Sequence, residues 1–181
     1  MARLPGADGA GEIAARIRAR RGGALRPLDG LLLHSPPIAD GWNSLLGAIR
    51  QRTALPPDIR ELVILRIAVL NRADYEWAAH EPEARAAGLG EAHLDAIRDE
   101  DADRHPAFDD RARRVIAYTD AMTRHVHVSD AVFDALRADF TDAEIVELTA
   151  TAAAYNMVSR FLVALDVELP RRPQALARSH T

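Results

Sequence analysis

Two glutamates, two aromatic residues and a histidine lie close together between positions 61 and 80 of the sequence. Glu76 and His80 are four residues apart, so on a helix their side chains share one face within mutual reach. A carboxylate beside an imidazole can fix its tautomer, raise its basicity and exchange a proton with it. Tyr75 and Trp77 flank the pair and could add a phenol donor and an apolar wall. The spacing indicates acid/base chemistry, although the same spacing also occurs as a weak solvated pair on many helices.

Two predicted helices must position these residues. Apolar side chains crowd residues 60–70, which predicts a helix that begins near residue 57 and is buried around much of its circumference, with Glu61 near its start. Asp74 is a good N-cap residue and predicts the start of a second helix. Gly88 is a typical residue for the left-handed position just after the end of that helix.

This segment resembles the signature of the alkylhydroperoxidase D / carboxymuconolactone decarboxylase family. The redox branch of that family has Glu, eleven residues, Cys-x-x-Cys, three residues and His. Here Glu61, Tyr75 and His80 keep their places, whereas the two cysteine positions hold Ala73 and Glu76. Four stretches are also similar to cysteine-free members of the family: residues 32–36, 75–80, 86–89 and 155–161.

The resemblance covers about residues 25–170 and implies a fold and a class of reaction. The fold would be an all-α, single-domain helical bundle of the alkylhydroperoxidase D-like type with about seven or eight helices, and the sequence shows no sustained period-two alternation. The chain has no cysteine, so cysteine-dependent peroxidase activity is excluded. The decarboxylase side of the family uses acid/base residues without a metal or organic cofactor. The resemblance therefore implies a cofactor-independent lyase or isomerase.

In that interpretation His80 and Glu76 shuttle the proton, Glu61 orients His80 or relays the proton, and Tyr75 donates to a developing oxyanion. The substrate would be a small carbonyl or lactone compound, which could be anionic. The predicted substrate-binding residues are Trp77, His34, Asn156 and Arg160, and the candidate partners of an anionic group are Arg66, Arg72 and Arg160.

Three of these residues have an alternative structural role. His34 closes a short apolar segment and could bond local backbone instead of substrate. Asn156 and Arg160, together with the neighbouring Tyr155, interrupt an apolar surface of the last helix, so they either satisfy neighbouring backbone or face the pocket.

A second function stays open, that of a non-catalytic, oligomeric ligand-binding or scaffold protein of the same fold. Glu76 distinguishes the two hypotheses because a buried carboxylate is costly without a purpose. A pocket-facing Glu76 near His80 favours chemistry, and a solvated one favours the second function. The family assembles as trimers or hexamers, so a homo-oligomer is expected.

Composition sets the remaining bounds. The chain has 181 residues, 48% hydrophobic and 28% charged, which is ordinary for one globular domain. We expect this domain at residues 11–170, with a flexible tail at 1–10 and another at 171–181. The net charge of −4 and the interspersed arginines give no reason to expect nucleic acid. The sequence shows no secretory signal and no apolar run long enough for a membrane span, so we expect a cytoplasmic protein.

Further helices are predicted from apolar spacing and caps. Residues 28–33 could be helix or buried extended chain, closed by two prolines. Thr141 and Glu144 form a capping box at the start of the last helix, which should reach about Val167. The other predicted helices span residues 11–21, 41–52, 91–100, 108–124 and 130–137.

Overall fold

The structure is a computed structural model that describes residues 2–168. This part of the chain contains nine α-helices, one 3₁₀ helix and no strand, which confirms the predicted all-α class. The elements are α1 Glu12–Arg21, α2 Pro27–Leu32, α3 Pro36–Gln51, α4 Pro57–Leu70, α5 Asp74–Ala86, α6 Glu91–Ala96, η1 Ala102–Arg104, α7 Asp110–His125, α8 Asp130–Arg137 and α9 Asp142–Ala164. Seven of the nine α-helices have at least seven residues. The predicted tail at 171–181 lies outside the described residues.

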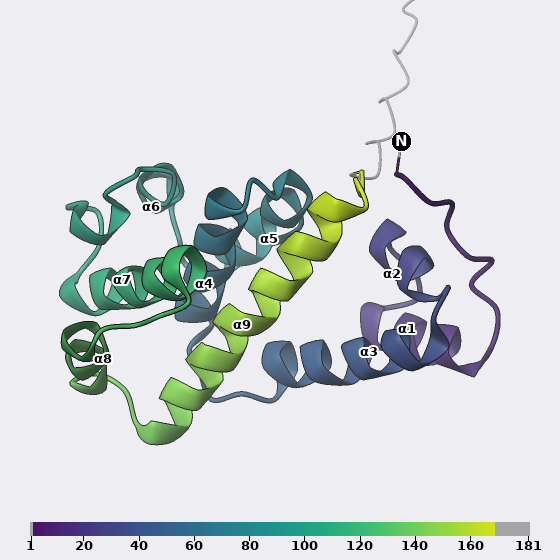
Figure 1. Ribbon diagram of the computed structural model, residues 1–181, viewed down its shortest axis with the longest axis horizontal. Helices are drawn as coiled ribbons and strands as arrows, with labels where there is room; N and C mark the ends of the chain where they lie inside the picture. The colour runs from purple at the N-terminus through teal and green to yellow at the C-terminus, as the bar shows by residue number, and fades with distance from the viewer. Residues whose placement is uncertain (1, 169–181) are drawn as a thin grey trace, which may run out of the picture.

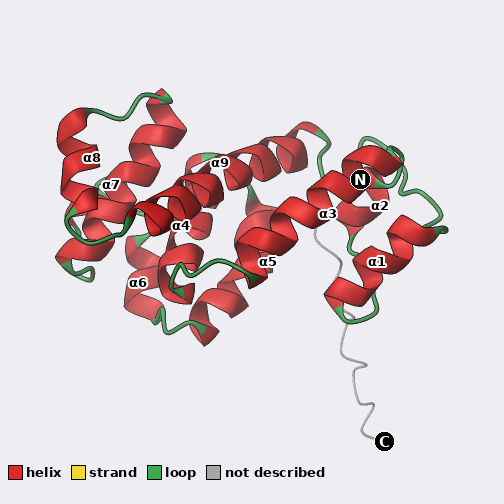
Figure 2. Cartoon of the chain, turned by 90° about the horizontal axis from the view of Figure 1, so that it is seen from below, coloured by secondary structure: helices red, strands yellow, loops and turns green. Residues whose placement is uncertain are grey.

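Helix α4 lies at the centre of the molecule and packs against α5, α7 and α9. Figures 1 and 2 show α1, α2 and α3 grouped at one end, α6, α7 and α8 at the other, and α9 crossing between them. Every residue of α4 from Glu61 to Ala68 is buried. The helix is therefore enclosed on all sides, as its apolar sequence predicted.

The turn between α4 and α5 brings the two helices of the candidate site together. Arg72 adopts a positive φ of 54° in this turn. The N-cap position of α5 is Ala73, not Asp74 as predicted; Asp74 lies in the first turn, where a carboxylate interacts favourably with the helix dipole. After α5, Gly88 has a φ of 101°, which confirms the left-handed position predicted for it.

Several predicted boundaries shift in the structure. Helix α3 begins at Pro36 rather than after Asp40, because prolines fit the first turn of a helix, where no backbone donor is needed. The ambiguous segment 28–33 is helical, as α2. Helix α6 ends at Ala96, and α9 ends at Ala164, before Asp166 adopts a positive φ of 52°.

Glu147 on α9 holds the connection between α3 and α4 in place. Its carboxylate accepts the backbone N–H groups of Ala54 and Leu55, both at 2.9 Å. The capping box predicted one turn earlier is present, with the Thr141 hydroxyl accepting the Glu144 N–H and the Glu144 carboxylate accepting the Thr141 N–H. The Glu147 bonds hold the α3–α4 connection beside α9, and the capping box stabilises the start of α9.

The N-terminal segment, predicted to be a flexible tail, makes backbone hydrogen bonds to two distant elements. The Arg3 N–H donates to the Leu165 carbonyl at 3.0 Å, and the Ala7 N–H donates to the Gly30 carbonyl at 2.9 Å. Within residues 2–168, no helix is both long and apolar enough to cross a membrane.

Candidate active site

Glu61 and His80 form a buried hydrogen-bonded pair between α4 and α5. The Nδ1 atom of His80 lies 2.7 Å from Oε2 of Glu61. The other carboxylate oxygen of Glu61 accepts from Nε of Arg60 at 3.2 Å. Because a carboxylate can only accept, His80 carries its proton on Nδ1 and presents the lone pair of Nε2 on the opposite side of the ring. This is the arrangement of an oriented base.

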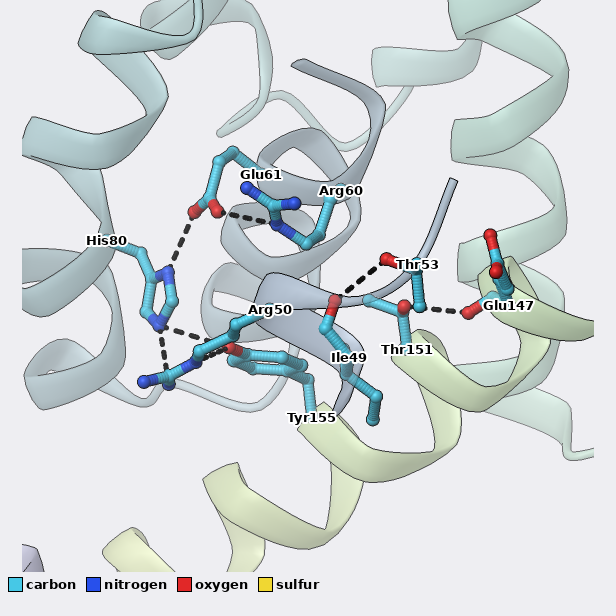
Figure 3. Close-up of polar contacts among 9 residues, drawn as sticks. All are labelled: Ile49, Arg50, Thr53, Arg60, Glu61, His80, Glu147, Thr151 and Tyr155. Atoms are coloured by element: carbon cyan, nitrogen blue, oxygen red, sulfur yellow. Dashed lines mark hydrogen bonds and ion pairs between the residues drawn. The ribbon is translucent and has the colours of Figure 1, made fainter. Parts of the chain in front are cut away.

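Two donors from other helices point at that lone pair. Nη2 of Arg50, from the end of α3, lies 3.0 Å from Nε2 of His80, and the Tyr155 hydroxyl, from α9, lies 3.3 Å from it. Arg50 also donates from Nε to the Tyr155 hydroxyl at 2.6 Å. Figure 3 shows the His80 ring between Glu61 on one side and Arg50 with Tyr155 on the other.

The protonation states follow from burial and from these partners. Burial lowers the pKa of His80 below its ordinary value, although the bond to Glu61 opposes this effect. Burial alone would raise the pKa of Glu61, but the His80 hydrogen bond and the Arg60 charge outweigh it and leave that pKa lowered. Burial raises the pKa of Tyr155 to about 12. At neutral pH the group therefore consists of an ionised Glu61, a neutral His80 and an intact phenol.

Glu76 is the other buried acid of the site. Only 2% of its surface is exposed, and within residues 2–168 its Oε2 atom has no hydrogen-bond partner. Burial raises the pKa of Glu76 to about 8, and the charge of Arg50 offsets only part of that rise. The predicted contact between Glu76 and His80 is replaced by the Glu61–His80 bond. Because burial raises its pKa, Glu76 is protonated at neutral pH and can donate.

Glu76 and His80 line the same small cavity, together with Tyr75 and Arg50. Its volume is about 20 Å³, which is room for about one water molecule. Tyr75 is buried, and burial raises its pKa above the ordinary value, so it is a phenol at neutral pH. Of the residues predicted to be catalytic, the structure thus places Tyr75, Glu76 and His80 on one cavity, with Glu61 directly behind His80.

The four predicted substrate-binding residues do not line this cavity. The guanidinium carbon of Arg98 lies over the Trp77 ring, 3.6 Å from the ring centroid. The indole N–H of Trp77 donates to the Glu81 carboxylate at 3.0 Å, and Trp77 does not line the cavity. His34 is exposed, and its Nε2 lies 2.7 Å from the Pro5 carbonyl oxygen, which is a backbone contact.

Asn156 and Arg160 belong to a separate polar network. The Asn156 amide donates to the Thr123 hydroxyl and to the Ala152 carbonyl, both at 3.0 Å. The exposed Arg160 donates to the Asn156 carbonyl at 3.0 Å. Of the two roles that the sequence left open, these contacts match the structural one.

The arginines predicted to pair with an anionic substrate also lie elsewhere. Arg66 is buried and bonded to Asp120, and Arg72 is exposed beside the groove that contains Trp77. Arg50, which the sequence analysis did not select, is the arginine that contacts His80. Its signal in the sequence is its place four residues after the buried Leu46, because a charged residue on the apolar face of a helix needs a partner.

Tyr155 is the second functional candidate that sequence reasoning did not select. It lies in a stretch that resembles the family, yet only tertiary structure shows that its hydroxyl reaches Arg50 and His80. Within residues 2–168, no group of three or more His, Asp or Glu side chains is arranged to hold a metal ion.

Comparison with solved structures shows several proteins of the same fold. A peroxidase-related protein with an alkylhydroperoxidase AhpD core from Ralstonia eutropha has a TM-score of 0.80 and 19% identity, covering 94% of this chain and 93% of its own. A protein of unknown function from Agrobacterium tumefaciens has a TM-score of 0.72 and 24% identity, covering 78% of this chain and 97% of its own. The debrominase Bmp8 has a TM-score of 0.70 and 14% identity, covering 88% and 84%. At these identities the likeness establishes the fold alone.

The fold and the site together define a cysteine-free, AhpD-like helical protein with a buried glutamate–histidine pair. Residues 36–121 match the model of the carboxymuconolactone decarboxylase family. With this match and the AhpD-like fold, the chain resembles the carboxymuconolactone decarboxylase / AhpD-like family. None of the curated proteins matches the chain.

Proposed function

We propose that the protein is a cofactor-independent acid/base enzyme, a lyase or isomerase that acts on a small carbonyl or lactone compound. The observation that carries the proposal is the pairing of a neutral, oriented His80 with a protonated, unpartnered Glu76 on one cavity. A base and an acid whose environments hold them in opposite protonation states at the same pH can take a proton at one atom and return it at another.

The first step is removal of a proton or of CO₂ next to the substrate carbonyl. In isomerisation Nε2 of His80 takes the proton, and Glu61 stabilises the imidazolium that forms. In decarboxylation the carbon–carbon bond to the carboxylate breaks instead, and CO₂ leaves. Both routes give an enolate with its charge on the former carbonyl oxygen.

Arg50 and Tyr155 are placed to stabilise that enolate. Their donors already converge on one acceptor, Nε2 of His80, and a substrate oxygen that displaces this acceptor would receive both bonds. Tyr75 lines the same cavity and is a further phenol donor. Glu76 then gives its proton to the enolate carbon. The ionised Glu76 regains a proton from the His80 imidazolium after isomerisation, and from solvent after decarboxylation.

A panel of lactones and β-keto acids tests the proposal, with turnover followed by proton NMR. Replacing His80 by Asn should lower turnover by about a hundredfold to ten-thousandfold, the usual contribution of a general base. Glu76→Gln should also impair turnover, because an amide cannot return a proton. The exposed His127→Asn variant is the matched control and should keep wild-type turnover. Wild-type turnover by His80→Asn would refute the proposed mechanism.

A second function, ligand binding without catalysis, has one observation in its favour. In the structure the Nε2 lone pair of His80 is already bonded to Arg50 and Tyr155, and the cavity has room for only about one water molecule. A ligand that raises the melting temperature of wild-type protein and of His80→Asn equally, without being converted, would favour this function.

We also propose that the chain forms a homo-oligomer, either a trimer or a hexamer, in keeping with the family. Exposed apolar side chains on α3 and α9 support this proposal, since such residues commonly mark contact surfaces: Ile38, Leu45, Val146, Met157 and Val163. Light scattering of the purified protein tests it, and a monomer at micromolar concentration would contradict it.

A further inference from the structure

A larger cleft reaches the site from the side of α1 and α2. Its volume is about 280 Å³, and His80 and Glu61 form part of its wall. The rest of the wall is unusually basic, with five arginines from four elements: Arg20, Arg21, Arg26, Arg50 and Arg60. The cleft is large enough for a small organic molecule, unlike the cavity beside Glu76.

Two of the five arginines are neutralised by buried acids. Arg21 pairs with Asp29 at 2.7 Å, and both side chains are buried. Arg60 pairs with Glu61 at 3.2 Å. These two guanidinium groups therefore have their counter-charges within the protein.

The other three have no carboxylate partner among residues 2–168. Arg20 donates to the neutral amide of Asn43, and Arg50 donates to Tyr155 and His80. The exposed Arg26 side chain makes no ion pair in this part of the chain. Glu83 is the one further acid on the wall of the cleft, so the described residues leave an excess of positive charge there.

Burial and the close approach of these arginines lower the pKa of one of them. Burial, followed by the charges of Arg21 and Arg50, lowers the pKa of Arg20 to about 10. Like charges that approach without counter-ions oppose folding. Stability therefore does not account for the cluster, whereas an anion in the cleft would remove the repulsion.

Most of the cluster lies outside the part of the chain that matches the family. Arg20 and Arg21 come from α1 and Arg26 immediately precedes α2, whereas the matched segment begins at residue 36. Figures 1 and 2 show α1 and α2 packed at the α3 end of the molecule, the end that supplies Arg50. The N-terminal helices therefore add a charged wall to a site whose acid/base groups come from α4 and α5.

We propose that Arg20 and Arg26, together with Arg50, bind an acidic group of the substrate and hold the rest of the molecule against His80. The acidic group is a carboxylate or a phosphate, because guanidinium groups pair with either through charge-assisted hydrogen bonds. This inference rests on the proposed function and assigns its substrate a negative charge. Arg20 and Arg26 are specificity-determining residues in this proposal, since neither contacts the reacting atoms.

Isothermal titration calorimetry with succinate and with inorganic phosphate tests the inference on the full chain. Arg26→Gln is the cleanest variant because Arg26 is exposed and unpaired, and Arg20→Gln is the second. Each should weaken binding of the preferred anion by about tenfold or more, the usual effect of removing a charged hydrogen-bond partner. Succinate binding tighter than phosphate identifies a carboxylate substrate, and the reverse identifies a phosphorylated one.

Arg16→Gln is the matched control, with the same charge change on the same helix but outside the cleft, where Arg16 pairs with Asp40 near the surface. It should bind both anions as wild type does. Equal affinities in Arg26→Gln, Arg20→Gln and wild type would overturn the inference, as would the absence of binding at millimolar anion. His80→Asn should still bind the anion, so turnover by that variant would refute the proposed function while leaving the arginine site intact.

Discussion

Helix α4 carries two buried charged residues, Arg66 and Glu61, whose surroundings differ. Arg66 is only 1% exposed and has five N–H donors. Two of them meet the Asp120 carboxylate, at 2.7 and 2.6 Å, and three meet the carbonyl oxygens of Ile97, Asp99 and Glu100. Every donor has an acceptor, so this network is closed.

The network around Glu61 is open by comparison. Glu61 and His80 satisfy each other on one side, but the far side of the imidazole faces Arg50 and Tyr155, and Oε2 of Glu76 has no partner within the described chain. A closed network on a helix stabilises the fold, whereas an open one leaves groups available for a ligand. The comparison indicates that Arg66 stabilises the fold, and it supports the role proposed above for Glu61.

Breaking the closed network should have the largest effect on stability. Arg66→Met leaves three carbonyl groups without a partner and Asp120 with only Arg124, 3.6 Å away, and we expect the free energy of unfolding to fall by about 3–5 kcal/mol. Urea denaturation measures this loss. Arg66→Met combined with Asp120→Leu should recover part of it, because no unpaired charge remains. A loss below about 1 kcal/mol for Arg66→Met would show that the network is not structural.

The open network should be sensitive to pH. The pKa of Glu76 is about 8 in the folded protein against an ordinary value of 4.5, so the folded state keeps a proton that the unfolded state releases. The stability that Glu76 contributes is thus complete below pH 4.5 and is lost as the pH rises through 8. A pKa shift of this size corresponds to a loss of a few kcal/mol in the free energy of unfolding. Urea unfolding of wild type and Glu76→Gln at pH 5 and pH 9 measures it.

The difference in unfolding free energy between wild type and Glu76→Gln reports on Glu76 alone, because His80 and Glu61 are present in both proteins. We expect Glu76→Gln to gain stability relative to wild type on going from pH 5 to pH 9. A constant difference across that range would mean that Glu76 is ionised or solvated, which removes the proton donor from the mechanism.

Tyr155→Phe removes one hydroxyl from the network around Glu61 and should change stability less than the two substitutions above. The variant loses the hydroxyl that Arg50 and His80 contact, and we expect it to cost about 1–2 kcal/mol of stability. It should also lower turnover, by about a hundredfold if the hydroxyl stabilises the enolate. Tyr118→Phe is the control, since that hydroxyl bonds only Thr149, at 2.8 Å, among the described residues. Equal turnover in both variants would argue against a role for Tyr155.

Arg160→Gln should have the smallest effect. Its side chain is exposed and bonds only Asn156, so we expect a change within about 0.5 kcal/mol and unchanged anion binding. A large loss of anion binding would restore Arg160 to the substrate site that the sequence predicted.

The sequence predicted the part of the site that local spacing determines. Helical spacing put Glu76 and His80 on one face, the resemblance to the family signature singled out Glu61 with His80, and the burial of α4 followed from its apolar circumference. Arg50 and Tyr155 reach His80 across 30 and 75 residues of sequence, and such contacts depend on how α3 and α9 pack. For the same reason the role of Arg66 was mistaken for anion binding, since its partner Asp120 is 54 residues away.

The most direct test of the account is the protonation state of His80 in solution, because it requires no knowledge of the substrate. Nitrogen-15 NMR of the imidazole at pH 7 distinguishes its three possible forms, and comparison with His80→Asn assigns the signals. We predict a neutral ring with the proton on Nδ1 and an unprotonated Nε2 that accepts from Arg50 and Tyr155. A ring protonated on Nε2, alone or together with Nδ1, would contradict the account, because His80 could not then act as the base.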